Sequence, residues 1–125
     1  MIPRIAEVFA LMFGSQRLAD MGLEVIADAK NGNFTRLNET HAISSGLKSI
    51  FTSDSMTGIE GLRRACGGHG FLMYSGIPGL LFEGSPSVTF EGENSIMLLQ
   101  TARFILKSLG YIQKGKRLPP TVMYL

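Results

Sequence analysis

The sequence contains one cysteine and almost no net charge. A single cysteine cannot form an intrachain disulfide, which excludes a disulfide-stabilised scaffold. The 12 lysines and arginines against 10 aspartates and glutamates leave a formal charge of +2. That charge is too small for the basic face that dominates nucleic-acid binding. No uncharged apolar run approaches the roughly 18–20 residues that span a bilayer. We therefore expect neither a nucleic-acid partner nor a membrane span.

What is present indicates one folded unit. The 125 residues are 45% hydrophobic, which is too apolar for a disordered segment and enough to form a core. The apolar N-terminus is interrupted by Glu7, and we interpret it as a core helix and not as a signal peptide. Glycine is in excess, with 15 residues in 125, against an average usage of about 7%. The placement of these glycines is informative.

Hydrophobic periodicity predicts three long helices, over residues 3–30, 39–65 and 92–109. Pro3 suits a first helical turn, Asn38 is a suitable N-cap for the second helix, and the Asn31–Asn33 segment is a suitable end for the first. Helices of this length bury their apolar stripes against one another. The fold class is therefore all-α, a bundle of long helices, and three helices where four would close a bundle suggest an incomplete one.

Two segments interrupt this helical pattern. Residues 66–89 hold several glycines together with Pro78 and Pro86, and we expect a loop there. Residues 52–57 are polar, which suggests a kink or break in the second helix. Beyond the third helix, Pro119 and Pro120 are expected to begin an extended tail.

The run Cys66-Gly67-Gly68-His69-Gly70 is the first candidate for chemistry. Three glycines in four positions let backbone N–H groups approach a ligand closely, as phosphate-binding turns require. The alternative is a helix C-cap followed by a tight turn. No predicted strand precedes the run, so it is not a dinucleotide-binding fingerprint.

The run Phe90-Glu91-Gly92-Glu93-Asn94 is the second candidate. A carboxylate beside a glycine can act as a general base where the site is dry enough to raise its pKa. Alternatively, the two glutamates are an acidic pair that complements the positive end of the helix dipole. Both interpretations stay open from the residues alone.

A metal site is not expected. Cys66, His69 and His41 are the available soft ligands, but no second ligand pair exists, and a structural zinc site needs four ligands. Cys66 lies near a helix C-terminus, which does not activate a thiol as a nucleophile.

The order of several motifs resembles the acyl-CoA oxidases, flavoenzymes of peroxisomal fatty-acid β-oxidation that are related to the acyl-CoA dehydrogenases. The resemblance extends over nearly the whole chain and is confined to the family's first C-terminal helical domain. The matching blocks, in chain order, are residues 37–48, 63–71, 75–78, 85–86, 89–94 and 98–104.

The resemblance implies a function. Family members oxidise a fatty acyl-CoA to the trans-2-enoyl-CoA, with FAD as cofactor and molecular oxygen as the final acceptor, which yields hydrogen peroxide. The family's catalytic glutamate falls on Glu91, and its backbone N–H is implied to polarise the thioester carbonyl. Gly92 is implied to turn the chain tightly beside the substrate, and Arg103 to lie near the CoA moiety.

The resemblance also implies a cofactor contact and an assembly. Gly67, Gly68 and Gly70 are similar to a turn that meets the FAD pyrophosphate across a homodimer interface. Localisation in the peroxisome is implied too, although the chain ends in Met-Tyr-Leu without a Ser-Lys-Leu-type signal. Family members are several times longer and have further helical and β domains, so we interpret residues 1–125 as a fragment.

Two functions follow as expectations. In the first, the chain supplies the catalytic base of an FAD-dependent acyl-CoA oxidase, although the fragment alone is inactive. In the second, it is a non-catalytic helical module that binds an intact oxidase subunit through apolar surface.

Overall fold

The computed structural model describes residues 2–124, and within them the chain is helical with no strand. The predicted all-α bundle of long helices is therefore confirmed. The long helices are α1 (Ile2–Lys30), α2 (Leu37–Ala65) and α5 (Asn94–Gln113). The short ones are α3 (Gly68–Phe71), η1 (Met73–Ser75), α4 (Ile77–Gly84), η2 (Ser85–Val88) and η3 (Pro120–Val122).

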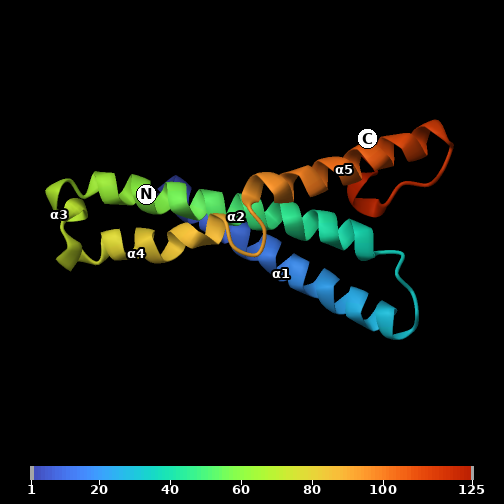
Figure 1. Ribbon diagram of the computed structural model, residues 1–125, viewed down its shortest axis with the longest axis horizontal. Coiled ribbons are helices and arrows are strands. Elements are labelled where there is room, and N and C mark those ends of the chain that lie inside the picture. The colour runs from blue at the N-terminus through green and yellow to red at the C-terminus, as the bar shows by residue number, and fades with distance from the viewer. Residues whose placement is uncertain (1, 125) are drawn as a thin grey trace.

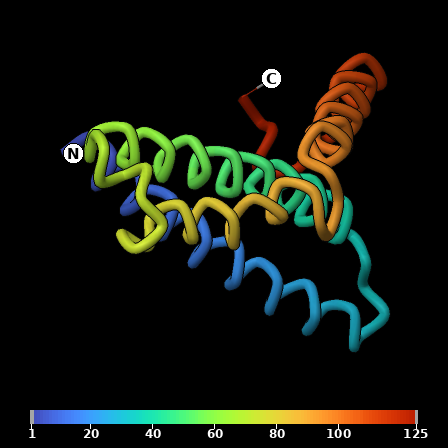
Figure 2. The backbone as a smooth tube through the Cα atoms, turned by 60° about the vertical axis from the view of Figure 1, so that its left-hand side comes forward, coloured from blue at the N-terminus to red at the C-terminus, as the bar shows by residue number. Residues whose placement is uncertain are grey.

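Helix α2 is the centre of the molecule (Figures 1 and 2). Helix α1 runs antiparallel along one side of it. On another side the chain returns along α2 in two parts, with α4 beside the C-terminal half of α2 and α5 beside its N-terminal half. Helices α1, α3, α4 and α5 thus make their main contacts with α2.

Helices α1 and α2 form a hairpin. The two helices lie close at Gly14, where a β-carbon would be in van der Waals contact with the Phe51 ring at 3.4 Å. Arg4 Nη1 lies 2.8 Å from Asp54 Oδ1 near the open end. At the closed end Gly32 has a φ of +75°, which confirms the predicted left-handed helix end.

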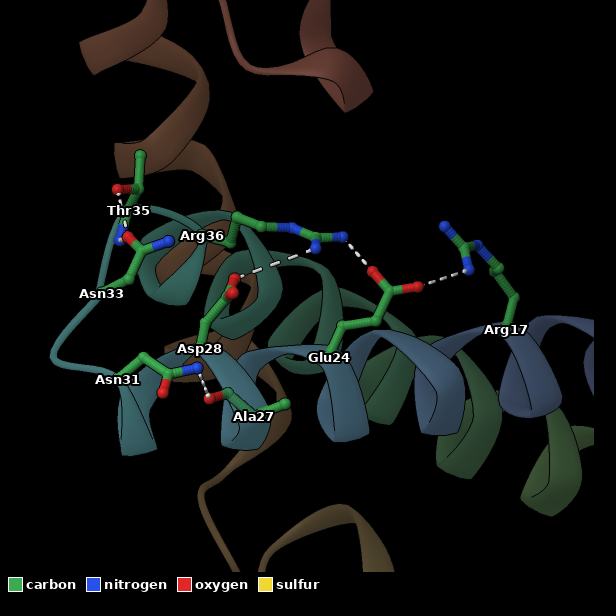
Figure 3. A network of polar contacts seen from close by, with 8 residues as sticks. All are labelled: Arg17, Glu24, Ala27, Asp28, Asn31, Asn33, Thr35 and Arg36. Carbon is green, nitrogen blue, oxygen red and sulfur yellow. Dashed lines mark hydrogen bonds and ion pairs between the residues drawn. The ribbon is translucent and has the colours of Figure 1, made fainter.

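Charged side chains tie the closed end of the hairpin together, as Figure 3 shows. Arg36 forms an ion pair and hydrogen bond with Glu24 and lies 3.9 Å from Asp28. Arg17 approaches the other oxygen of Glu24 at 3.6 Å. Because of these partners, above all Arg36, the pKa of Glu24 is lowered from its ordinary value.

Small side chains let α2 and α5 approach each other. Buried residues of α2 recur at helical spacing on one stripe: Ala42, Ser45, Gly46 and Ser49. Thr101 of α5 donates a 2.8 Å hydrogen bond to the Ala42 carbonyl. A β-carbon at Gly46 would lie 3.0 Å from the same Thr101 hydroxyl, so glycine permits this crossing distance.

The expected loop over residues 66–89 is wrong, because most of this segment is helical. Pro78 lies in the first turn of α4, where proline is tolerated. Gly76, with a φ of +76°, is the residue before that helix. Glycine and proline here mark the starts of short helices. Such short helices are marginal alone, and packing on α2 stabilises them.

Two details of α2 also differ from expectation. Residues 52–57 continue the helix without a break. The helix begins at Leu37 after Arg36, which provides no side-chain cap, so the predicted Asn38 N-cap is wrong. At the other long helix, α5 continues past Gly110 to Gln113.

The C-terminal tail forms η3 and folds back onto α2, so the extended tail expected from Pro119 and Pro120 is wrong. Glu39, buried in the first turn of α2, accepts hydrogen bonds from the Thr121 backbone N–H at 2.9 Å and hydroxyl at 2.5 Å. Val122 is only 4% exposed. This contact anchors η3 beside the helix that is 82 residues earlier in the chain.

Much of the apolar surface is uncovered. Within residues 2–124, the buried hydrophobic side chains are those of Met21, Ala42 and Val122. The accessible surface is 8752 Å², whereas a compact monomer of 13.6 kDa would expose about 6,600 Å². No helix among the described residues has the length and hydrophobicity to cross a membrane.

Candidate functional site around Glu91

The Glu91 segment forms the break between the two parts of the returning chain. Helix α4 ends at Gly84 and η2 at Val88, and α5 begins at Asn94. The connecting turn lies about halfway along α2, where Figure 1 shows it as a thin orange loop. Glu91 has a φ of +57° and Gly92 a φ of +105°. Within residues 2–124, Glu91 is the only non-glycine residue in the left-handed region, a conformation that costs about 1–3 kcal/mol.

A lysine of α2 forms hydrogen bonds to this turn and to the start of α5. Lys48 Nζ donates to the Gly92 carbonyl oxygen at 2.6 Å and to Asn94 Oδ1 at 2.8 Å. Lys48 is half-buried. The Gly92 carbonyl, next to the strained Glu91, is therefore held by a side chain of α2 that lies 44 residues earlier in the chain.

Asn94 joins the same network from the start of α5. Its buried amide Nδ2 donates to the Ser49 carbonyl at 3.2 Å and to the hydroxyls of Thr52 and Ser53 at 2.8 Å each. Ser49 in turn donates to the Asn94 carbonyl at 3.0 Å. Polar groups on α2 thus satisfy backbone and side-chain groups where the facing helix is interrupted.

The two glutamates of the motif have different environments. Glu93 is the N-cap of α5, and its carboxylate accepts from the backbone N–H groups of Ser95 at 2.8 Å and Ile96 at 3.2 Å. This confirms the dipole interpretation for Glu93. Glu91 is exposed, and neither its carboxylate nor its N–H has a hydrogen-bond partner among residues 2–124. Its side chain is therefore available to a ligand.

The glycine-rich run ends α2 and starts α3. Gly67 has a φ of +56° directly after the C-cap Cys66, so the predicted cap and tight turn are present. Gly67 and Gly68 are exposed, and no atom lies within 4 Å of a β-carbon built on either. Gly70 is buried, and a β-carbon there would lie 2.0 Å from the Arg63 carbonyl oxygen. Close packing on α2 explains Gly70.

The structure brings some of the predicted site residues together and separates others. Glu91 and Gly92 share one turn, whereas the glycine run lies at the far end of α2 (Figure 1). Arg103 is exposed on α5. His41 lies in the first half of α2, away from Cys66 and His69. Among residues 2–124, no three histidine, cysteine or acidic side chains form a metal-binding group.

Sequence reasoning missed the network formed by Lys48, Ser49, Thr52, Ser53 and Asn94. A signal was present, because residues 48–53 contain four polar side chains in six positions of an otherwise amphipathic helix. By local propensity alone, the overlapping polar stretch 52–57 suggests a weak point in the helix. In the structure these side chains face the turn that holds Glu91.

Comparison with known proteins gives a consistent result. The model of the "Acyl-CoA oxidase, C-alpha1 domain" family matches residues 1–106. An acyl-coenzyme A oxidase of Caenorhabditis elegans is 39% identical over the whole chain, and the peroxisomal acyl-coenzyme A oxidase 1 of Bos taurus is 38% identical. The chain spans only 19% of the length of each.

Comparison with solved structures indicates the same family. The C. elegans acyl-CoA oxidase-1 in complex with FAD and ATP superposes with a TM-score of 0.92 at 38% identity, over 96% of this chain and 18% of that one. Acyl-CoA oxidase 1 of Arabidopsis thaliana gives 0.87 at 36% identity, over 94% and 18%. By sequence and by fold, the chain belongs to the acyl-CoA oxidase family.

Proposed function

We propose that this chain supplies the catalytic base of an FAD-dependent acyl-CoA oxidase, and that the base is Glu91. Residues 1–125 would then be the first C-terminal helical domain of that enzyme. The observation that carries the proposal is the strained, exposed position of Glu91 in a turn fixed to α2. Backbone strain concentrates at functional positions, and here it occurs at the residue that the family motif assigns as the base.

The chemistry asked of Glu91 is proton transfer from carbon. Its carboxylate would accept the α-proton of a fatty acyl-CoA, and its unpaired backbone N–H would donate to the thioester carbonyl, where negative charge develops. FAD, held in part by Gly67 and Gly68, would supply the acceptor for the β-hydride. The two electrons and the proton of that hydride, with the proton released again from Glu91, would reduce molecular oxygen to hydrogen peroxide. The organic product is the trans-2-enoyl-CoA. Gly92 would keep the chain beside the substrate free of a side chain.

The cofactor assignment is supported at two of the three glycines. Gly67 and Gly68 leave open backbone, and the N–H groups of Gly68 and His69 have no acceptor among residues 2–124. Such free N–H groups suit the oxygens of a pyrophosphate. Gly70 faces α2, so we assign it a supporting role in the shape of this turn. A homodimer, a CoA contact at Arg103 and a peroxisomal location complete the proposal.

The test uses a hybrid oxidase in which residues 1–125 replace the matching segment of the C. elegans acyl-CoA oxidase-1. Glu91→Gln should lower peroxide formation from acyl-CoA by about 10²- to 10⁴-fold with flavin content unchanged. Glu93→Gln is the matched control, because its carboxylate caps α5, and it should keep most of the turnover. Turnover by the Glu91→Gln enzyme close to that of the parent would contradict the assignment.

A second function has one observation in its favour. The uncovered apolar surface would suit a non-catalytic module that binds an intact oxidase subunit. Size-exclusion chromatography with a flavin absorbance scan separates the two. Colourless protein that co-elutes with an intact oxidase favours the module, and a flavin-bound homo-oligomer favours the catalytic role.

A further inference from the structure

We infer that Lys48 is a positioning residue for Glu91: it sets the place of the Glu91 carboxylate through the Gly92 carbonyl. This inference rests on the proposed function, because the Lys48–Gly92 contact can serve catalysis only if Glu91 is the base. Lys48 lies on α2, whereas Glu91 precedes α5. The two helices would thus share one site.

Within the described part of the chain, the half-buried Lys48 contacts neutral groups and no carboxylate. Its ammonium donates to two uncharged oxygens, those of the Gly92 carbonyl and the Asn94 amide. Among residues 2–124, no carboxylate lies within ion-pair distance of it, whereas Arg4, Arg36 and Arg63 each have an acidic partner. The ammonium of Lys48 therefore interacts with the Glu91 turn and not with an acidic side chain.

Asn94 makes the position of the ammonium rigid. Its Nδ2 is held by the Ser49 carbonyl and by the hydroxyls of Thr52 and Ser53. With Nδ2 held by these groups, Oδ1 points at Lys48. A side chain whose partners are themselves hydrogen-bonded keeps a single geometry.

The turn is fixed on both sides of Glu91. Before it, the Phe90 N–H donates to the Pro86 carbonyl at 2.9 Å. After it, Lys48 holds the Gly92 carbonyl at 2.6 Å. Without the second contact, Glu91 and Gly92 could relax from their left-handed conformations, and the carboxylate would leave the position it has now.

The kinetic test uses the hybrid oxidase with Lys48→Met, which removes the ammonium and keeps an unbranched chain. We expect kcat to fall by up to about 100-fold, the effect of misplacing a reacting group by about 1 Å, with KM and flavin content within twofold. Lys48→Arg restores a cationic donor and should recover most of the loss. Lys107→Met, on the exposed part of α5, is the control and should change nothing.

A spectroscopic measurement on the hybrid oxidase, labelled with ¹³C at its glycine carbonyl carbons, separates this inference from the proposed function. Lys48→Met should shift the carbonyl ¹³C resonance of Gly92, and Lys48→Arg should restore it in part. An unchanged Gly92 resonance, or a shifted one with unchanged kcat, would overturn the role of Lys48. A parallel loss of flavin or substrate binding would also overturn it. If Glu91→Gln keeps its turnover while the Gly92 resonance still responds, the proposed function is the part that fails.

Discussion

Gly70 lets α3 pack directly against the backbone at the end of α2, because glycine has no side chain. A β-carbon there would lie 2.0 Å from the Arg63 carbonyl oxygen and 2.9 Å from its carbon. These are backbone atoms at the end of α2 and cannot rotate away. Either α3 would move off α2 or the helix end would unwind.

We therefore expect Gly70→Ala to destabilise the chain by about 1–3 kcal/mol, the usual cost of overpacking. Gly68→Ala is the matched control, since it lies two residues away with no atom within 4 Å of its β-carbon position. Urea unfolding followed by circular dichroism measures both. Equal midpoints for the two variants would show that α3 is not packed as described.

At this scale the sequence predicts residues whose role is local. Gly32 at the end of α1 and Gly92 in the Glu91 turn both have a positive φ, which suits the turn that each one forms with its chain neighbours. Lys48 and Glu39 could not be predicted, because their partners lie 44 and 82 residues away. Hydrogen bonds over such separations leave no periodic trace in one sequence.

Between elements, the charged network at the closed end of the α1–α2 hairpin makes stability depend on pH. Hydrogen bonding to Arg36 lowers the pKa of Glu24 in the folded chain. Within α2, near its other end, a hydrogen bond from Arg63 does the same for Glu60. A group whose pKa is lower when folded stabilises the fold above its unfolded value, about 4.3 for glutamate. That stabilisation is lost as the pH falls through the folded value.

We accordingly expect Arg36→Gln to lower the thermal unfolding midpoint at pH 7, and the difference from the parent to shrink below about pH 4. The effect should be small and should weaken in high salt, because the pair is exposed. Arg103→Gln removes the same charge without an ion-pair partner among residues 2–124 and should show no such trend. A difference that is constant with pH would exclude the Arg36–Glu24 pair as its source.

The long helices could be predicted and the short ones could not, for a physical reason. Helices α1, α2 and α5 each repeat an apolar stripe over 20 residues or more, which periodicity detects. Helix α4 has eight residues, too few to be stable without neighbours. Its helicity depends on α2, which no local pattern encodes.

At the scale of the whole molecule, the chain exposes far more apolar surface than its size requires. Phe9 of α1 is 54% exposed and Phe82 of α4 is 81% exposed. The glycine run and the Glu91 turn lie apart, and Gly67, Gly68 and Glu91 are open to solvent. Under the proposed function each of them would form one wall of a site, since nothing among residues 2–124 encloses a cofactor at either place.

The purified 125-residue chain should therefore be colourless and form no peroxide from acyl-CoA. Its apolar faces should make it bind a hydrophobic dye and associate at micromolar concentration. Absorbance, a peroxide assay and size-exclusion chromatography measure these properties. Oxidase turnover by the chain alone would contradict the view that each site is incomplete.

The central position of α2 has a consequence for the order of folding. The α1–α2 hairpin closes through a short connection, residues 31–36, whereas the Lys48–Gly92 contact must wait for a loop of more than forty residues to close. Contacts of low sequence separation form sooner because their closure costs less entropy. The turn that holds Glu91 would thus form late, on a helix that is already folded. In a newly made chain the α1–α2 hairpin would form before the Glu91 carboxylate reaches its final position.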